Sequence, residues 1–158
     1  MSYPEIGSPA PSFRLPVVGE GYPEGTLLSS ADLAGKVYVL YFYPKDDTPG
    51  CTTQACALRD DWSELSDKAA VFGVSIDPPQ SHRKFIQKHH LPFPLLSDEE
   101  KTLAEAYGVW VEKSMYGKTY WGSERSTFVI GPDGILKAVL PKVKPAGHLG
   151  QLLGILTA

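Results

Sequence analysis

The sequence contains two cysteines, Cys51 and Cys56, and they lie five residues apart. Two thiols this close together can form part of a metal site, close a structural disulfide, or carry out redox chemistry. They follow the apolar run KVYVLYFYP and a Thr-Pro-Gly. Apolar residues then recur at spacings of three and four, which predicts a helix from about residue 51 to residue 70. Its apolar face comprises Cys51, Ala55, Leu58, Trp62, Leu65 and Ala69.

A metal site is the least favoured of these three interpretations. A structural zinc ion needs four ligands, usually with short spacers, so two cysteines would need histidine partners. The chain has four histidines, at positions 82, 89, 90 and 148, and no His-x-x-x-His pair. His82 and His89 would be separated by a rise of roughly 10 Å along one helix, which is too far to share an ion. We therefore expect each histidine to be exposed or at the edge of a helix.

A permanent disulfide is also disfavoured if residues 51 to 56 are helical. Five helical residues give a rise of about 7.5 Å and a turn of about 140°, or roughly 8.6 Å between the two Cα atoms. A disulfide needs less than about 7 Å. The two cysteines can therefore bond only if the first turns of the helix unwind.

Redox chemistry makes use of this separation. Cys51 falls at the predicted start of the helix, where unpaired N–H groups and the helix dipole favour a thiolate. Thr48 can cap this end or hydrogen-bond there. Cys56 lies about 140° around the helix, off the apolar face, so the two thiols are unequal. Asp46 and Asp47 would oppose ionisation of Cys51 if they faced its sulfur.

A nearby cation would offset these acidic residues, and the sequence offers two candidates. Arg59 is close in sequence, whereas Arg125 leads into the predicted strand STFVI, which can pack beside the start of the helix. Sequence alone does not choose between them.

Composition sets the broad class of protein. The chain has 158 residues, 42% hydrophobic and 21% charged, with a formal net charge of −3. This suits one globular domain, residues 1–158. No basic cluster indicates a nucleic-acid partner, and no run reaches the roughly 18 apolar residues of a membrane span. The first residues lack the pattern of a signal peptide, so we expect a cytoplasmic protein.

The remaining elements predict an α/β fold. KVYVLYFYP and AVFGVSID are continuous apolar runs, typical of strands covered on both faces. SFRLPVV reads as an edge strand because Pro16 would interrupt a central one, and it belongs to an expected N-terminal β-hairpin arm. Residues 29–36 read as one helical turn, and helices are expected over residues 79–90, over 97–107 with a capping box at Ser97, and after Pro145. Residues 127–140 predict a hairpin. A βαβ unit followed by ββα is the thioredoxin-like plan, a mixed central sheet flanked by helices.

The segment YPKDDTPGCTTQAC resembles the active-site segment of peroxiredoxins, in particular the bacterioferritin comigratory protein or peroxiredoxin Q group. Pro44, Thr48 and Cys51 fill the family pattern Pro-x-x-x-Thr-x-x-Cys, and Cys56 matches the second cysteine of this group. The family also carries an arginine from a distant strand, here matched by Arg125. The resemblance extends from GSPAPSFRLP to VKPAGHLGQLL, nearly the whole chain.

The resemblance implies a thiol peroxidase. Cys51 would attack hydrogen peroxide or an organic hydroperoxide and become a sulfenic acid, which Cys56 would convert to an intramolecular disulfide. Pro44 would shield the pocket, Thr48 would hydrogen-bond the thiol and the peroxide, and Arg125 would stabilise the thiolate. Thioredoxin or a similar dithiol would reduce the disulfide. The resemblance further implies a monomer without metal, haem or flavin.

Two other functions stay open at this point. One is a thiol–disulfide oxidoreductase acting on proteins, although the chain lacks the Cys-x-x-Cys of a plain thioredoxin. The other is a copper-handling thioredoxin-like protein that uses both cysteines and a histidine.

Overall fold

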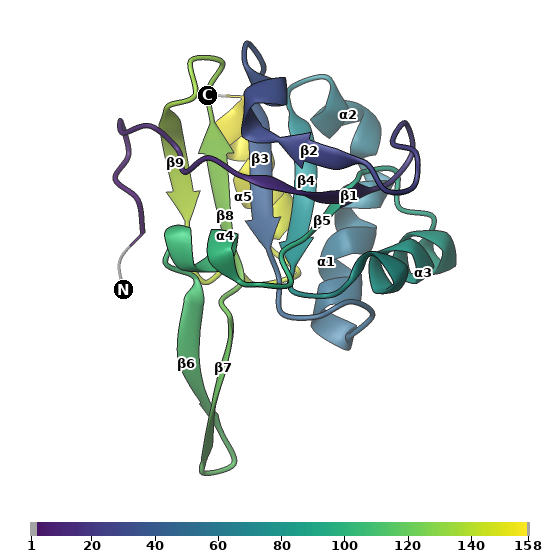
Figure 1. Ribbon diagram of the computed structural model, residues 1–158, viewed down its shortest axis with the longest axis vertical. Coiled ribbons are helices and arrows are strands. Elements are labelled where there is room, and N and C mark those ends of the chain that lie inside the picture. The colour runs from purple at the N-terminus through teal and green to yellow at the C-terminus, as the bar shows by residue number, and fades with distance from the viewer. Residues whose placement is uncertain (1–2, 158) are drawn as a thin grey trace.

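The computed structural model describes residues 3–157, in which seven strands form one mixed sheet (Figure 1). The order of the strands is β2-β1-β5-β4-β3-β8-β9, and β6 and β7 form a separate two-stranded sheet. The main-sheet strands are β1 (Arg14–Val18), β2 (Leu27–Ser29), β3 (Tyr38–Phe42), β4 (Ala70–Ser75), β5 (Leu95–Ser97), β8 (Ser126–Ile130) and β9 (Leu136–Leu140). The helices are η1 (Ser30–Leu33), α1 (Pro49–Asp60), α2 (Trp62–Ser66), α3 (Pro79–His89), α4 (Thr102–Ala106) and α5 (His148–Leu156).

Strand β3 is the centre of the sheet, as its continuous apolar sequence predicts. All five of its residues are buried, and it pairs in parallel with β4 and antiparallel with β8. Because side chains alternate along a strand, Leu40 and Phe42 join one core, and Val39 and Tyr41 join the other. The second core also contains Cys51. The position of β3 therefore places the segment that follows it directly over the sheet.

Helices cover both faces of the sheet, which confirms the thioredoxin-like plan. Apolar residues of α1, α2, α3 and α5 pack into the core that contains Cys51, and those of η1 and α4 pack into the other core. No helix in residues 3–157 has the length and apolar character needed to cross a membrane.

The predicted helix over residues 51–70 is two helices. α1 ends at Asp60, and Asp61 leaves the helical conformation (φ −116°, ψ 29°) before α2 begins at Trp62. The predicted apolar face is otherwise confirmed: Ala55, Leu58 and Leu65 are fully buried. The prediction missed the break because both helices present their apolar residues to the same core.

The expected N-terminal hairpin is formed by β1 and β2, but the prediction that β1 is an edge strand was wrong. Strand β1 pairs with β2 on one side and with β5 on the other, so the hairpin joins the main sheet. Pairing with β5 involves only Val17 and Val18, which follow Pro16. The missing N–H of Pro16 therefore does not interrupt this ladder, and β2 is the edge strand.

The capping box predicted at Ser97 was also wrong. Ser97 is the last residue of β5, a short strand that the sequence analysis did not anticipate. Helix α4 starts later, and the carboxylate of Asp98 caps it by accepting the N–H groups of Leu103 (3.1 Å) and Ala104 (2.8 Å). The hairpin over residues 127–140 and the turn η1, with its Ser29–Asp32 capping box, are confirmed.

A second hairpin, β6 (Trp110–Met115) and β7 (Lys118–Ser123), projects from the body of the protein (Figure 1). It was not predicted. Its two-residue turn, Tyr116-Gly117, has positive φ at both positions, the geometry that connects tightly paired antiparallel strands.

Candidate active site

Cys51 lies at the start of α1, directly after the loop that leaves β3. Thr48 is the N-cap residue, Pro49 is the first helical residue and Cys51 is the third. The first N–H groups of a helix have no acceptor within it, so the N–H of Cys51 belongs to the end of the helix that favours negative charge. The Cys51 side chain is buried. This is the predicted environment for a reactive thiolate.

Cys56 differs from Cys51 in its surroundings. It is partly exposed, and both cysteines are free thiols. All residues from Pro49 to Asp60 are helical, so the helix between the two cysteines is unbroken. The unequal environments predicted for the two thiols are therefore present in the fold.

Arg125 is the cation that the fold brings to the start of α1. It immediately precedes β8. Gly50, the residue before Cys51, has no Cβ, and a Cβ placed at this position would lie 3.1 Å from Nη2 of Arg125. Gly50 therefore leaves the room that the guanidinium occupies. Arg59 lies near the other end of α1, where it donates to the carbonyl of His89 (2.7 Å) and pairs with Asp60.

A buried hydrogen-bond network holds Arg125. Its Nη1 donates to Oε1 of Gln54 (2.7 Å), and Nε2 of Gln54 faces Nδ1 of His148 (2.9 Å). Since arginine only donates, the amide NH₂ of Gln54 must donate to Nδ1, and the proton of the His148 ring is then on Nε2, which faces Thr127 (2.8 Å). Burial, and then the charge of Arg125, lowers the pKa of His148 to about 4.

This network links positions far apart in the sequence, so local patterns did not indicate it. The expectation that the histidines are exposed or at helix edges was wrong for His82 and His148, both of which are fully buried. One signal was available: Gln54 is a polar residue between Cys51 and Ala55, close to the apolar face of α1.

A second cation missed by the sequence analysis is Lys113, the fourth residue of β6, whose side chain reaches back toward the base of the hairpin. Its Nζ donates to the carbonyl of Ser123 (2.5 Å). Burial, and then the charge of Arg125, lowers the pKa of Lys113, whereas the charge of Cys51 raises it. The base of the projecting hairpin therefore lies in the electrostatic environment of Arg125 and Cys51.

Thr48 and Pro44 are on the loop between β3 and α1, and both are half-buried. The hydroxyl of Thr48 donates to the carbonyl of Lys45 (2.9 Å) and does not cap the helix. Within residues 3–157, neither Thr48 nor Arg125 donates a hydrogen bond to the sulfur of Cys51. Of the five predicted site residues, Pro44, Thr48, Cys51 and Cys56 thus follow one another along the loop and helix after β3, and Arg125 packs against Gly50 from a distant part of the sequence.

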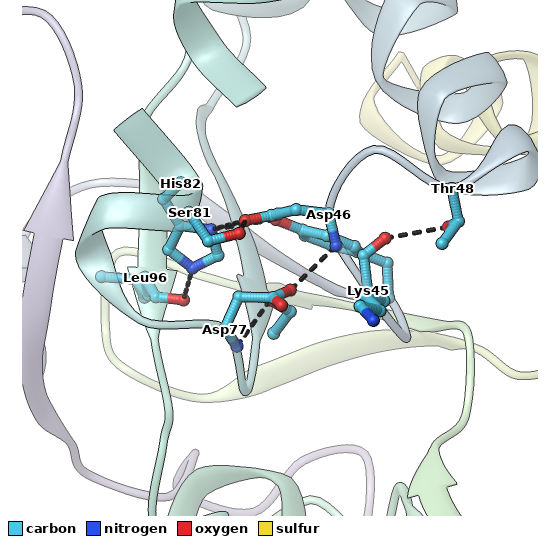
Figure 2. Close-up of polar contacts among 9 residues, drawn as sticks. Lys45, Asp46, Thr48, Asp77, Ser81, His82 and Leu96 are labelled. Carbon is cyan, nitrogen blue, oxygen red and sulfur yellow. Dashed lines mark hydrogen bonds and ion pairs between the residues drawn. The ribbon is translucent and has the colours of Figure 1, made fainter. Parts of the chain in front are cut away.

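The two aspartates of this loop are engaged by α3. The carboxylate of Asp46 contacts His82 at 2.7 Å and accepts from Ser81 (Figure 2). It also accepts from Tyr43. Asp47 is exposed and pairs with Lys88 (2.7 Å) and His89 (2.9 Å), which lower its pKa. Their oxygens are therefore committed to Tyr43, the residue after β3, and to side chains of α3.

The fold and the site together define a class of protein: a thiol-based redox enzyme on a thioredoxin-like sheet, with its reactive cysteine at a helix start beside an arginine. The family model of the AhpC/TSA family matches residues 6–139. A curated relative named putative peroxiredoxin bcp, from Coxiella burnetii, is 51% identical over 151 residues, which cover 95% of this chain and 97% of the relative. Peroxiredoxin Bcp of Escherichia coli is 43% identical over 145 residues, 91% of this chain and 90% of the relative.

Solved structures of peroxiredoxins are similar to this chain as well. Peroxiredoxin Q of Xanthomonas campestris superposes with a TM-score of 0.83 at 40% identity, covering 92% of this chain and 89% of that one. A cysteine-to-serine mutant of PrxQ from Xylella fastidiosa superposes with a TM-score of 0.88 at 34% identity, covering 99% and 98%. The chain belongs to the AhpC/TSA family and is a peroxiredoxin of the Bcp and peroxiredoxin Q group.

Proposed function

We propose that this peroxiredoxin reduces hydrogen peroxide and organic hydroperoxides through Cys51. The observation that carries this proposal is the buried thiol of Cys51 at the start of α1, with Arg125 packed against the preceding residue. The thiolate attacks one oxygen of the O–O bond. That bond breaks, the sulfur becomes a sulfenic acid, and the other oxygen takes up a proton and leaves as water or an alcohol.

The residues around Cys51 have separate roles in this step. Arg125 favours the thiolate and stabilises the charge that develops on the peroxide oxygens. Pro44 shields the sulfur from water. Thr48 accepts from the thiol and donates to the peroxide. Because its hydroxyl donates to Lys45 in the structure, Thr48 must turn from that carbonyl to donate to the substrate.

Cys56 completes the cycle as the resolving cysteine. Its thiol attacks the sulfenic sulfur of Cys51, water leaves, and a disulfide forms. The helix between the two cysteines must unwind for this step, since ideal helical geometry holds their Cα atoms roughly 8.6 Å apart. A dithiol reductant, which we take to be thioredoxin, then reduces the disulfide by exchange.

The relatives support the substrate class. One Xanthomonas campestris structure is described as giving insights into the alkyl peroxide reduction activity of its bacterioferritin comigratory protein. We further infer that residues 1–158 act as one domain, in the cytoplasm and as a monomer.

Stopped-flow measurements test the proposal. The reduced protein is mixed with hydrogen peroxide or cumene hydroperoxide, and NADPH oxidation through thioredoxin reductase and thioredoxin reports turnover. We expect turnover with the wild type and none with Cys51→Ser. Turnover that persists in Cys51→Ser would contradict the assignment of the nucleophile.

Two further measurements address the alternative functions. If the protein were a thiol–disulfide oxidoreductase, it would reduce insulin disulfides with thioredoxin-like efficiency while consuming peroxide slowly. If it handled copper, the reduced protein as purified would contain stoichiometric copper. We expect neither result.

A further inference from the structure

The loop between β3 and α1 is fastened to α3 by a single buried side chain, that of Asp46. This loop carries Pro44 and Thr48. Figure 2 shows the Asp46 carboxylate directed at Ser81 and His82, which lie in the first turn of α3. Both Asp46 and His82 are buried, at 7% and 0% exposed, although they lie 36 residues apart in the sequence.

Both carboxylate oxygens of Asp46 have hydrogen-bond partners. Oδ1 accepts from the hydroxyl of Tyr43 at 2.5 Å, and Oδ2 accepts from Ser81 at 2.7 Å and faces Nδ1 of His82 at 2.7 Å. Burial, and then the charge of Asp46, raises the pKa of Tyr43, so this hydroxyl keeps its proton and donates. The backbone N–H of Asp46 donates to Asp77 at 2.8 Å.

The two nitrogens of His82 have different partners. Nε2 contacts the backbone carbonyl of Leu96 at 2.9 Å, and a carbonyl can only accept, so Nε2 carries a proton. Nδ1 faces Oδ2 of Asp46 at 2.7 Å, a hydrogen-bond distance. His82 thus joins the loop to β5 as well as to α3.

Asp47, the residue after Asp46, holds the same loop at the surface of the protein. Asp47 adopts a left-handed conformation (φ 57°) and pairs with Lys88 and His89 in the last turn of α3. Consecutive aspartates therefore anchor the loop to both ends of one helix, Asp46 inside the protein and Asp47 at its surface. The part of the site before Pro49 is tied to α3, whereas the part after it belongs to α1.

We propose that His82 is a positioning residue for the peroxide site, which acts through Asp46. The proposal rests on the function proposed above. Disulfide formation requires the first turns of α1 to unwind and refold in each cycle. The Asp46–His82 pair keeps the loop, and with it Pro44 and Thr48, in one position on α3, so that the site is restored when α1 refolds.

Three residues of this network are also of the types that bind metal ions. Asp46, Asp77 and His82 offer ligand atoms within 4.8 Å of one another. These atoms are already engaged: Asp77 accepts from the Asp46 N–H and from Ser75 (2.6 Å), and His82 bonds Asp46 and Leu96. The hydrogen bonds account for the arrangement without an ion.

Two amide substitutions of His82 separate its two bonds. In His82→Asn the amide group takes the place of Nδ1 and can donate to Asp46, whereas the bond to Leu96 is lost. In His82→Gln the amide reaches the place of Nε2 and can donate to Leu96, whereas the bond to Asp46 is lost. If His82 positions the loop through Asp46, only the glutamine variant loses activity.

The experiment measures two reactions of Cys51 in each reduced variant. We expect the reaction with hydrogen peroxide to slow roughly ten- to hundredfold in His82→Gln, since a misplacement of about 1 Å can cost this much, and to change little in His82→Asn. Alkylation by iodoacetamide, which needs the thiolate but not the loop, should stay near the wild-type rate in both. His90→Asn, at the exposed end of α3, is the matched control.

Equal peroxide rates in the two variants, whether both fast or both slow, would overturn the proposal, because a merely structural role would not distinguish the two bonds. Circular dichroism verifies that each variant is folded. If His82→Gln does not fold, Asp46→Ala is measured instead. Slow peroxide reaction with normal alkylation supports the proposal, and wild-type peroxide reaction overturns it. Failure of the proposed function is distinct, because the wild type itself would then not consume peroxide.

Discussion

Cys56 follows Cys51 by five residues in one unbroken helix, and the two thiols are free. Ideal helical geometry places their Cα atoms roughly 8.6 Å apart, beyond the reach of about 7 Å that a disulfide allows. The folded state therefore keeps Cys51 available for peroxide. Bond formation between these residues requires a change in α1, and this gives the oxidised protein a structural signature.

We expect oxidation by one equivalent of hydrogen peroxide to unwind the first turns of α1. Hydrogen exchange should then lose protection at residues 51–57, and far-UV circular dichroism should show a loss of helix. Cys56→Ser, which cannot form the bond, should keep its protection after the same treatment. Equal protection in the reduced and oxidised wild type would show that the two cysteines do not bond to each other.

Replacing Cys56 should separate the two halves of the reaction. Cys56→Ser keeps the start of α1 and Arg125, so it should reduce one equivalent of peroxide at close to the wild-type rate. It should then stop as a sulfenic acid, because no second thiol is present to attack the sulfenic sulfur and expel water. Dimedone traps this sulfenic acid, and mass spectrometry detects the product. Turnover with thioredoxin that equals the wild type would remove Cys56 from the resolving role.

The cation at the start of α1 can be tested with a matched pair of arginines. Arg125→Ala removes the guanidinium beside Gly50, so the peroxide reaction of Cys51 should slow roughly 100-fold or more, as for other donors that stabilise developing charge. Arg59→Ala removes a charge near the other end of α1 and should leave this rate near wild type. Stopped-flow mixing of each reduced variant with hydrogen peroxide gives the rate. A larger effect from Arg59→Ala would mean that the cation was wrongly assigned.

The sequence predicted what depends on neighbours along the chain. The apolar run of β3, the periodic apolar residues of α1 and the turn between β8 and β9 each carry their own signal, and all three are confirmed. The inequality of the two cysteines followed from the same periodicity. Positions that fill a family motif, such as Pro44 and Thr48, could be placed because they precede Cys51 directly.

Contacts between distant segments could not be predicted in this way. His82 meets Asp46 across 36 residues and His148 meets Gln54 across 94, and neither histidine lies in a pattern that distinguishes it from a surface residue. Strand β5 was missed because it has only three residues, and its burial comes from β1 and β4 on either side. Ser97 matched a capping box, but pairing of β5 with β4 outweighed that local preference.

The buried His148 should make the protein less stable as the pH falls from neutrality. Its pKa is about 4 in the folded state, lowered by burial and by Arg125, against 6.5 for the ordinary side chain. Above pH 6.5 the ring is neutral in both states and this contribution to stability is complete. Between pH 6.5 and pH 4 the unfolded chain binds a proton that the folded protein does not, so about 3 kcal/mol should be lost.

Urea unfolding at several pH values measures this contribution, with His148→Asn as the comparison. The asparagine amide can still accept from Gln54 in the place of Nδ1, but it does not titrate. Other acid-sensitive groups, such as Asp47 and Asp133, have lowered pKa values in both proteins, so their effects cancel in the difference. We expect the gap between wild type and variant to narrow or reverse as the pH falls from 6.5 to 4. Parallel stability curves over this range would show that His148 takes up its proton equally in both states.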